Sequence, residues 1–214
     1  EEAFGVPVYQ GYGLTEAGPI SHGVKLSGPR PPHSSCGTPV PGCDTKLIDE
    51  NGAEHASFGE LWMKSPGVTP GYHNLPEVNR QRIVDGWLRT GDLFEIDGQG
   101  FFHFKGRTDD MFQCGGESVY PIEVENLLLR HPDVANVCVV SVPHDIKGEV
   151  PVAMVVRVAG DTGTQADGAA LKQFCLDQGP AYSHPREIVF VEALPLTGVA
   201  KVDRRAIRQR MIEG

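Results

Sequence analysis

The sequence predicts an α+β protein in which a β-rich part, residues 1–108, is followed by a small mixed α/β domain, residues 109–214. Glycine (26 residues) and proline (17 residues) make up a fifth of the 214 residues, which favours turns and short strands over long helices. The pattern of apolar residues changes near residue 109, where strands and turns give way to strands that alternate with helices. The hydrophobic content of 40% is sufficient for packed cores.

The first part is expected to fold as short strands joined by turns. Residues 28–42 contain five prolines, which oppose regular structure. Asn51-Gly52 is a turn signal between two apolar segments, and residues 97–100 are typical of a hairpin turn. The expected strands are Val8–Gln10, which runs into a Gly-rich loop, Thr45–Asp49, Glu60–Lys64, Leu93–Ile96 and Phe101–Phe104.

The second part is expected to alternate between helices and strands. Pro121 suits the first turn of a helix that ends before Pro132. Asp167 is expected to cap a helix over residues 169–176, and Asp203 a helix over residues 204–211. The expected buried strands are Val134–Val142, Val150–Val158 and Ile188–Val191.

Charge and composition exclude several classes of function. The chain has 28 acidic and 19 basic residues, a net charge of −9, so no nucleic-acid partner is expected. No apolar run approaches the roughly 20 residues of a membrane span. Five cysteines without Cys-x-x-Cys spacing indicate reduced thiols, and residues 1–5 lack the features of a signal peptide, so a cytoplasmic protein is expected. The absence of an initiator methionine indicates a fragment.

The first candidate site is the segment from Tyr9 to Glu16, a strand that leads into a loop with two glycines and ends in Thr15 and Glu16. Glycine allows backbone amides to approach a phosphate, a threonine hydroxyl can donate a hydrogen bond to it, and glutamate can bind Mg²⁺. An ordinary turn that starts the next element is the alternative interpretation.

Three further residues have side chains suited to a nucleotide. Asp92 follows a Thr-Gly pair and could accept hydrogen bonds from a ribose diol. Arg107 could bind a ribose or a phosphate, and Lys201 could stabilise negative charge that develops at a phosphoryl centre. For each of them, a solvated surface group is the alternative.

Together and in this order, these segments resemble motifs of the adenylate-forming superfamily, which includes acyl- and aryl-CoA synthetases, carrier-protein adenylation domains and luciferases. Residues 106–110 resemble the interdomain hinge motif of that family, and Lys201 its C-terminal lysine. The other similar segments are residues 12–16 (Tyr-Gly-x-Thr-Glu), 59–62 with 71–72 (Gly-Glu-Leu and Gly-Tyr), 87–92 (Trp-x-x-Thr-Gly-Asp) and 115–125.

The resemblance implies that residues 1–108 are the β-rich end of a large adenylation domain and residues 109–214 its small mobile C-terminal domain. It implies ATP, Mg²⁺ and CoA as cofactors and a small-molecule carboxylic acid as substrate. The implied nucleotide contacts are Tyr12 near adenine, Thr15 at phosphate, Glu16 at Mg²⁺, Asp92 and Arg107 at the ribose hydroxyls, and Phe104 packed beside the nucleotide.

For the small domain, the resemblance implies three roles. Lys201 would bridge the incoming carboxylate and the α-phosphate during adenylation. Asp109 would be the hinge about which the domain rotates, and Gly115, Gly116 and Glu117 would then lie near CoA. The family usually has glycine directly before the lysine, whereas this chain has Ala200.

Three interpretations of the whole protein are open at this point. The first is an acyl- or aryl-CoA ligase for fatty or aromatic acids, which the stretch from Gln113 to Glu125 favours. The second is an adenylation enzyme that loads a carrier protein, and the third is a non-catalytic truncated member of the family. The acid and the oligomeric state, including a homo-oligomer, are not fixed by the sequence.

Overall fold

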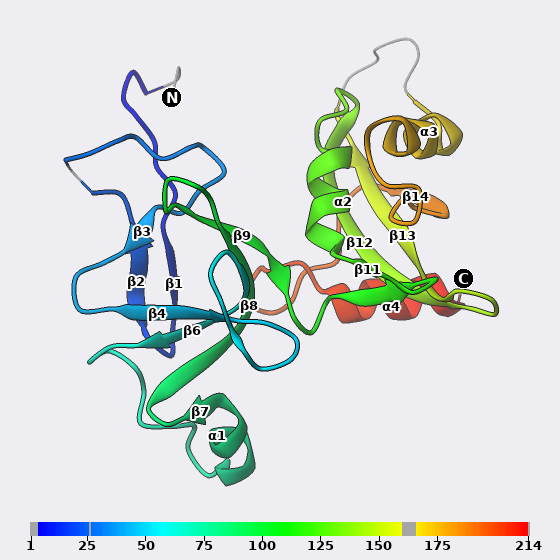
Figure 1. Ribbon diagram of the computed structural model, residues 1–214. Coiled ribbons are helices and arrows are strands. Elements are labelled where there is room, and N and C mark those ends of the chain that lie inside the picture. The colour runs from blue at the N-terminus through cyan, green and yellow to red at the C-terminus, as the bar shows by residue number, and fades with distance from the viewer. Residues whose placement is uncertain (1–3, 26, 160–165, 214) are drawn as a thin grey trace. The chain divides into compact units, whose positions relative to one another are not determined.

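The structure, a computed structural model, describes residues 4–25, 27–159 and 166–213 (Figure 1). The chain divides into two compact units between Thr108 and Asp109. Both units are rich in β-sheet and carry few helices, which confirms the predicted α+β class.

The first unit contains two antiparallel sheets. Leu47, Leu61, Met63 and Phe94 are buried in its core. One sheet has the order β1 (Tyr12–Leu14), β2 (Gly18–Gly23), β3 (Thr38–Pro39). The other has the order β5 (Glu54–His55), β4 (Asp44–Ile48), β6 (Phe58–Lys64), β8 (Trp87–Ile96), β7 (Ile83–Val84), with β9 (Phe102–Arg107) also paired to β8.

The N-terminal strand lies later in the chain than predicted. Residues 8–10 form no strand, so the strand expected at Val8–Gln10 is wrong, and β1 occupies the segment expected to be a Gly-rich loop. A Cβ atom on Gly13 would lie 2.2 Å from the carbonyl oxygen of Pro19 on β2. The glycine therefore allows two strand backbones to approach closely, which no side chain would permit.

Several short elements of the first unit were not expected, namely helix α1 (Pro76–Arg82) and strands β2, β3, β5 and β7. Helix α1 begins with proline in its first turn, a position at which proline is favoured. Strand β3 falls within the proline-rich residues 28–42, where Gly23 pairs with Thr38 and His22 with Pro39. Proline lies at the edge of this small sheet, as its missing N–H requires.

The second unit is one mixed sheet covered by helices. Its described strands have the order β11 (Glu117–Val119), β10 (Phe112–Cys114), β13 (Gly148–Arg157), β12 (Val134–His144), and β14 (Glu187–Val191) pairs in parallel with β13. The helices are α2 (Pro121–Leu128), α3 (Gly168–Gln178) and α4 (Arg204–Glu213).

Alternation along β12 places helices on both faces of this sheet. Val137 and Val139 pack in the cluster that includes residues of α2 and α3, whereas Cys138 and Val140 pack against Ile207 of α4. Both predicted helix caps are confirmed. The carboxylate of Asp167 accepts from Ala170 N at 2.8 Å, and that of Asp203 accepts from Ala206 N at 3.0 Å.

The hairpin of β10 and β11 was not predicted. Gly115 and Gly116 form its two-residue turn, with φ values of +63° and +91°. Positive φ at both positions is the geometry that matches the twist of a tight hairpin, and it favours glycine. The Gly-Gly pair was a turn signal in the sequence.

The described helices are short, and none has the length and apolar character needed to cross a membrane. All five cysteines are buried and free. Burial raises the pKa of the Cys138 thiol to about 12 and that of Cys36 to about 11. Both thiols therefore stay protonated at neutral pH.

Candidate active site

Three predicted site residues of the first unit meet at one carboxylate. Asp92 on β8 accepts a hydrogen bond from the Tyr12 hydroxyl on β1 through Oδ2, and Arg107 Nη1 on β9 lies 3.1 Å from Oδ1. Burial and the adjacent Asp92 raise the pKa of Tyr12, so the phenol stays a hydrogen-bond donor. Burial also raises the pKa of Asp92, while Tyr12 and Arg107 oppose this shift. The three side chains offer an acceptor and donors to a polyhydroxyl ligand.

Aromatic rings extend this cluster. Phe94 lies at its centre, with its ring centroid 4.9 Å from that of Tyr12 and 5.7 Å from that of Phe104. Phe104 is 41% exposed, so one part of its ring is free to pack against a ligand. Phe94 is fully buried and was not predicted as a site residue, because an aromatic residue in an apolar strand segment is typical of a core.

The predicted phosphate and metal residues lie in the turn between β1 and β2. Thr15 is exposed there. Glu16 Oε1 accepts a hydrogen bond from the Tyr72 hydroxyl at 3.0 Å, and its carbonyl oxygen accepts from Thr69 N at 2.7 Å. In the described part of the chain, no group of three or more His, Cys, Asp or Glu is suited to hold a metal ion. A single carboxylate fits Mg²⁺, which commonly takes one or two protein ligands, several waters and substrate phosphates.

Sequence reasoning missed two residues of this region, Arg82 next to Gly91 and Tyr72 at Glu16. A Cβ atom on Gly91 would lie 2.6 Å from Arg82 Nη1 and 3.2 Å from Arg107 Nη2, so two guanidinium groups flank this glycine. Arg82 ends helix α1, which was itself not predicted. Tyr72 belongs to the Gly-Tyr motif at residues 71–72, and this motif is the sequence signal that could have identified it.

His22 of β2 lies directly behind the cluster. Its side chain is fully buried, and its ring centroid is 4.6 Å from that of Phe102 and 5.7 Å from that of Tyr12. Nδ1 lies 3.1 Å from Ser21 Oγ, whereas Nε2 has no hydrogen-bond partner among the described residues. Burial lowers the pKa of His22 to about 4, because the surroundings do not solvate an imidazolium.

The first unit is therefore expected to lose stability in mild acid. Since the folded pKa of His22 lies below its unfolded value, the stabilisation is complete above about pH 6.5 and declines as the pH falls to about 4, by roughly 3 kcal/mol. Urea unfolding followed by tryptophan fluorescence measures this, because Trp62 and Trp87 both lie in the first unit. In a His22→Phe control, this component of the pH dependence should disappear. An identical pH dependence in both proteins would contradict the assignment.

In the second unit, Lys201 lies in a tight loop before α4. Thr197 N donates to the Lys201 carbonyl oxygen at 2.7 Å, and Lys201 N donates to Thr197 Oγ1 at 3.2 Å. Ala200 has a φ of +58°, a left-handed conformation that glycine adopts without strain. The Lys201 side chain is exposed and makes no hydrogen bond or ion pair within the described residues. It is therefore free to meet a ligand.

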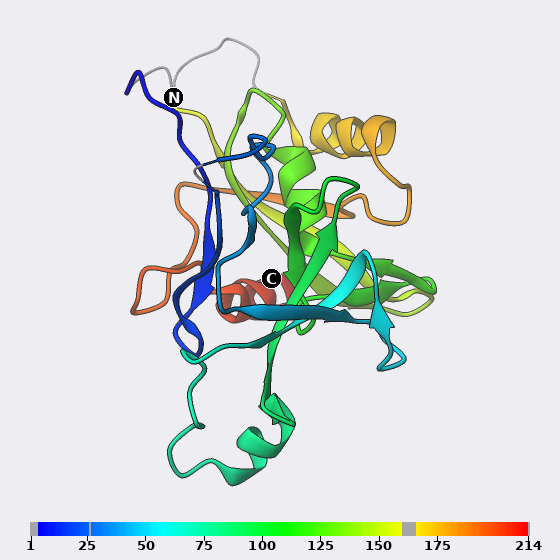
Figure 2. The ribbon, with the colours of Figure 1, turned by 60° about the vertical axis from the view of Figure 1, so that its left-hand side comes forward.

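Gly115, Gly116 and Glu117 lie at the opposite end of α4 from Lys201. Arg204 contacts Val139 and Arg208 contacts Ser141, so α4 runs along β12 towards the β12–β13 turn. Gly115 N donates to the carbonyl oxygen of Lys147 in that turn. Gly116 has open space around its Cα. Figure 2 also shows the loop before α4 and the β12–β13 turn on different sides of this helix.

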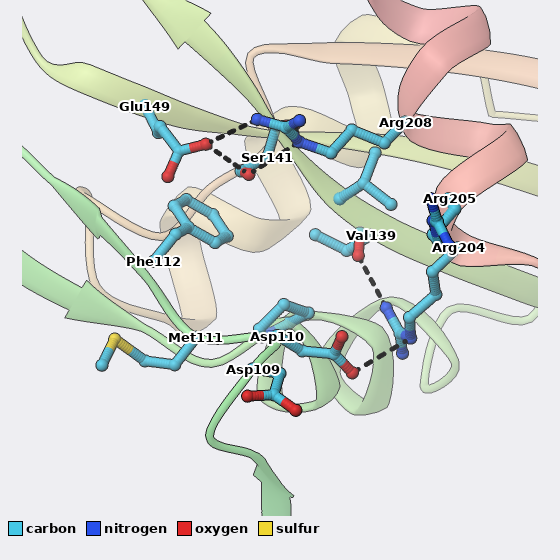
Figure 3. A pocket seen from close by; sticks show the side chains of 12 residues that line it. Asp109, Asp110, Met111, Phe112, Val139, Ser141, Glu149, Arg204, Arg205 and Arg208 are labelled. Carbon is cyan, nitrogen blue, oxygen red and sulfur yellow. Dashed lines mark hydrogen bonds and ion pairs between the residues drawn. The ribbon is translucent and has the colours of Figure 1, made fainter. Parts of the chain in front are cut away.

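Asp109 lines a cavity of about 330 Å³ within the second unit (Figure 3). Its walls include Asp110, Phe112, Ser141, Glu149 and three arginines of α4. Asp110 Oδ2 lies 3.5 Å from Arg204 Nε, and Glu149 Oε1 lies 3.0 Å from Arg208 Nη2. The ion pair with Arg204 therefore links Asp110, the residue directly after Asp109, to helix α4 of the second unit.

Comparison with known proteins identifies the class of this chain. The family model for AMP-binding enzymes matches residues 1–73, and the model for the C-terminal domain of AMP-binding enzymes matches residues 123–201. The chain is 36% identical to the oxalate–CoA ligase of Arabidopsis thaliana over 217 residues, covering all of this chain and 41% of the relative. It is also 36% identical to the indoleacetate–CoA ligase of Aromatoleum aromaticum, over 96% of this chain and 40% of the relative.

Solved structures agree with this class. The anthranilate CoA ligase AuaEII, in complex with anthranoyl-AMP, matches with a TM-score of 0.86 and 31% identity over 99% of this chain and 41% of that chain. The amide bond synthetase McbA from Marinactinospora thermotolerans matches with a TM-score of 0.77 and 32% identity over 84% of this chain and 36% of that chain.

These matches place the chain in the family of AMP-binding enzymes. The chain belongs to the adenylate-forming superfamily and corresponds to the C-terminal portion of its members, as the motifs predicted. It spans about two fifths of the length of the curated relatives it matches.

Proposed function

We propose that the complete protein is an AMP-forming acyl- or aryl-CoA ligase. The observation that carries this proposal is the similarity to CoA ligases along the entire chain, with 36% identity to two of them. The substrate would be a small carboxylic acid. ATP would supply the phosphorus that activates the acid, and CoA the thiol that receives it. A cytoplasmic location is consistent with free cysteines and with these cofactors.

In the first unit, Asp92 and Arg107 would hold the ribose hydroxyls. The carboxylate offers free lone pairs beside a guanidinium that is 44% exposed, which suits a diol. Tyr12 would orient Asp92 by its hydrogen bond and lie near adenine, with Phe104 packing beside the nucleotide. Thr15 would contact phosphate and Glu16 would hold Mg²⁺.

In the second unit, Lys201 would stabilise negative charge on the α-phosphate and the incoming carboxylate. Its free ammonium group supports this role. Gly115, Gly116 and Glu117 would line the path of CoA, and their position at the other end of α4 supports a rotation about Asp109 that exchanges the two ends. Rotation about a residue at the boundary of two units, as Asp109 is, is a common hinge geometry.

The acceptor has alternatives of different chemistry. A carrier protein would present the same thiol on a phosphopantetheine arm. The similarity to an amide bond synthetase favours an amine as a further candidate acceptor. A non-catalytic truncated chain would activate no acid at all.

One assay distinguishes these functions. Pyrophosphate release from Mg·ATP should depend on a carboxylic acid when the complete protein is tested with fatty, aromatic and dicarboxylic acids. CoA should stimulate release with the preferred acid. Stimulation by an amine or by a carrier protein, but not by CoA, would transfer the assignment to that acceptor. The absence of acid-dependent release throughout would overturn the proposal.

A further inference from the structure

Strand β8 has a bulge at residues 90–92, the last of which is the carboxylate proposed to bind ribose. The pairs Glu60–Leu93 and Trp62–Arg89 leave only one residue of β6 opposite these three residues of β8. Extra residues in one strand bend it and change the direction of the neighbouring side chains. The bulge therefore determines where this carboxylate points.

Side chains and the neighbouring strand bind the backbone of the bulge. Thr90 Oγ1 donates to a carbonyl oxygen of β6 at 2.7 Å and accepts from Asp92 N at 3.0 Å. The Gly91 carbonyl oxygen accepts from Thr108 N at 2.9 Å. The buried Gly91 N donates to Glu60 Oε1 at 3.1 Å. Glu60 thus provides the acceptor for an N–H group that the strand ladder leaves out.

Glu60 is itself held in place. Its side chain is only 10% exposed, and Oε2 accepts from Trp62 Nε1 at 3.1 Å and from Arg89 Nη2 at 3.0 Å. Neighbours of Glu60 on β6, Leu61 and Met63, face the core. Because side chains alternate along a strand, Glu60 lies on the other face of the sheet. Its contact with the site therefore runs through the backbone of the bulge.

We propose that Glu60 is a positioning residue for nucleotide binding. Its carboxylate fixes the Gly91 amide, and this in turn fixes the orientation of Asp92 towards Tyr12 and Arg107. The inference rests on the proposed function, because that proposal assigns the ribose hydroxyls to Asp92. Gly91 has a φ of +74° and two arginines beside its Cα, so the bulge has little freedom to adopt another shape around a lost acceptor.

The test compares binding of Mg·ATP and Mg·2′,3′-dideoxyATP to the complete protein by calorimetry. Glu60→Leu should weaken ATP binding about tenfold to a hundredfold, the scale of a lost hydrogen bond to a charged group, and leave dideoxyATP binding nearly unchanged. Glu60→Asp keeps the charge but has a shorter side chain, so it should weaken ATP binding less than Glu60→Leu does. If Glu60→Leu does not fold, the comparison of ATP and dideoxyATP binding by Glu60→Asp tests the proposal. Glu95→Leu, which removes a carboxylate of β8 that pairs with Lys105 instead of the bulge, is the matched control and should preserve the preference for ATP.

Asp92→Asn separates the two proposals. If Asp92→Asn removes the preference for ATP over dideoxyATP, and Glu60→Leu adds nothing in that background, the two residues act in one chain of contacts. Equal weakening of both nucleotides by Glu60→Leu and Glu60→Asp would overturn the positioning role and leave the proposed function intact. If the wild-type protein binds neither nucleotide, or if Asp92→Asn leaves the preference unchanged, the ribose assignment itself fails.

Discussion

Replacement of Lys201 by alanine in the complete protein is expected to lower acyl-adenylate formation by a factor of about 10² to 10³. This is the scale observed when one preorganised donor to a charged transition state is removed. The exposed ammonium group has no partner in the described structure that would have to be displaced. The effect should therefore appear in the adenylation rate and not in the stability of the second unit.

Two half-reactions distinguish this role from a structural one. Adenylation is measured by exchange of labelled pyrophosphate into ATP, and thioester formation is measured from a supplied acyl-adenylate and CoA. Only the first should fall in Lys201→Ala. A control, Lys172→Ala, removes an ammonium group of the same unit whose contact is a 3.4 Å bond to the Arg186 carbonyl oxygen, and it should change neither rate. Equal losses in both half-reactions of Lys201→Ala would contradict the proposed role.

Apart from the β10–β11 hairpin, the elements of the second unit could be predicted because their signals are local. Asp167 and Asp203 each bond to the amide three residues later, and Pro121 opens a helix, so the evidence lies within one helical turn. The β12–β13 pair consists of two apolar runs separated by a short turn. Such patterns are visible without knowledge of the fold.

The first unit was predicted less well because its strands depend on contacts with other segments. Gly13 allows β1 to pair closely with β2, but two glycines within three residues, Gly11 and Gly13, are equally typical of a loop. The bulge in β8 is also invisible in the sequence. Its shape depends on Glu60, which lies about 30 residues before Gly91 and on a different strand.

The candidate site shows the same division. Tyr12 and Asp92 are 80 residues apart, so no spacing rule joins them, and only the resemblance to a family placed them at one ligand. Phe94 and Arg82 carry no motif and became visible only through their contacts. Residue chemistry suggested what each side chain could do, whereas the sheet order decided which of them meet.

Replacement of Arg204 by methionine is expected to destabilise the second unit by up to about 3 kcal/mol. This is the lower end of the cost of leaving one partner of a buried ion pair without the other, because the Arg204 side chain is itself 30% exposed. Arg204 Nη2 lies 2.8 Å from Glu125 Oε1, and the Glu125 side chain is only 7% exposed. Burial alone would lower the pKa of Arg204, but Glu125 more than compensates and the pKa is raised. The carboxylate would thus lose its stabilising charge.

The same pair closes the free edge of β12, which is the last strand in the order of the described sheet. Val139 N donates to Glu125 Oε1 at 2.7 Å, and Val139 O accepts from Arg204 Nη1 at 2.8 Å. One turn further along α4, Arg208 Nε donates to Ser141 O at 3.0 Å. Four helical residues rise about 6 Å and two strand residues about 7 Å, so the arginines match alternate carbonyl groups of the edge. Loss of Arg204 would therefore also expose an unpaired strand group.

Amide hydrogen exchange in β12 and β13, measured by mass spectrometry on the 214-residue chain, reports this stability directly, while peptides of the first unit provide an internal reference. Arg205→Met is the matched control, since Arg205 is exposed on the same helix and makes no hydrogen bond or ion pair in the described structure.

Glu125→Gln should partly rescue Arg204→Met, because the amide oxygen can still accept from Val139 N while the unpaired charge is gone. Wild-type protection in Arg204→Met, or purely additive losses in the double variant, would show that the pair does not act as a unit. Rescue by Glu125→Gln would show that the loss of stability comes from the unpaired Glu125 carboxylate. The hydrogen bond from Arg204 to Val139 O is absent both in Arg204→Met and in the double variant, so it cannot explain a difference between them.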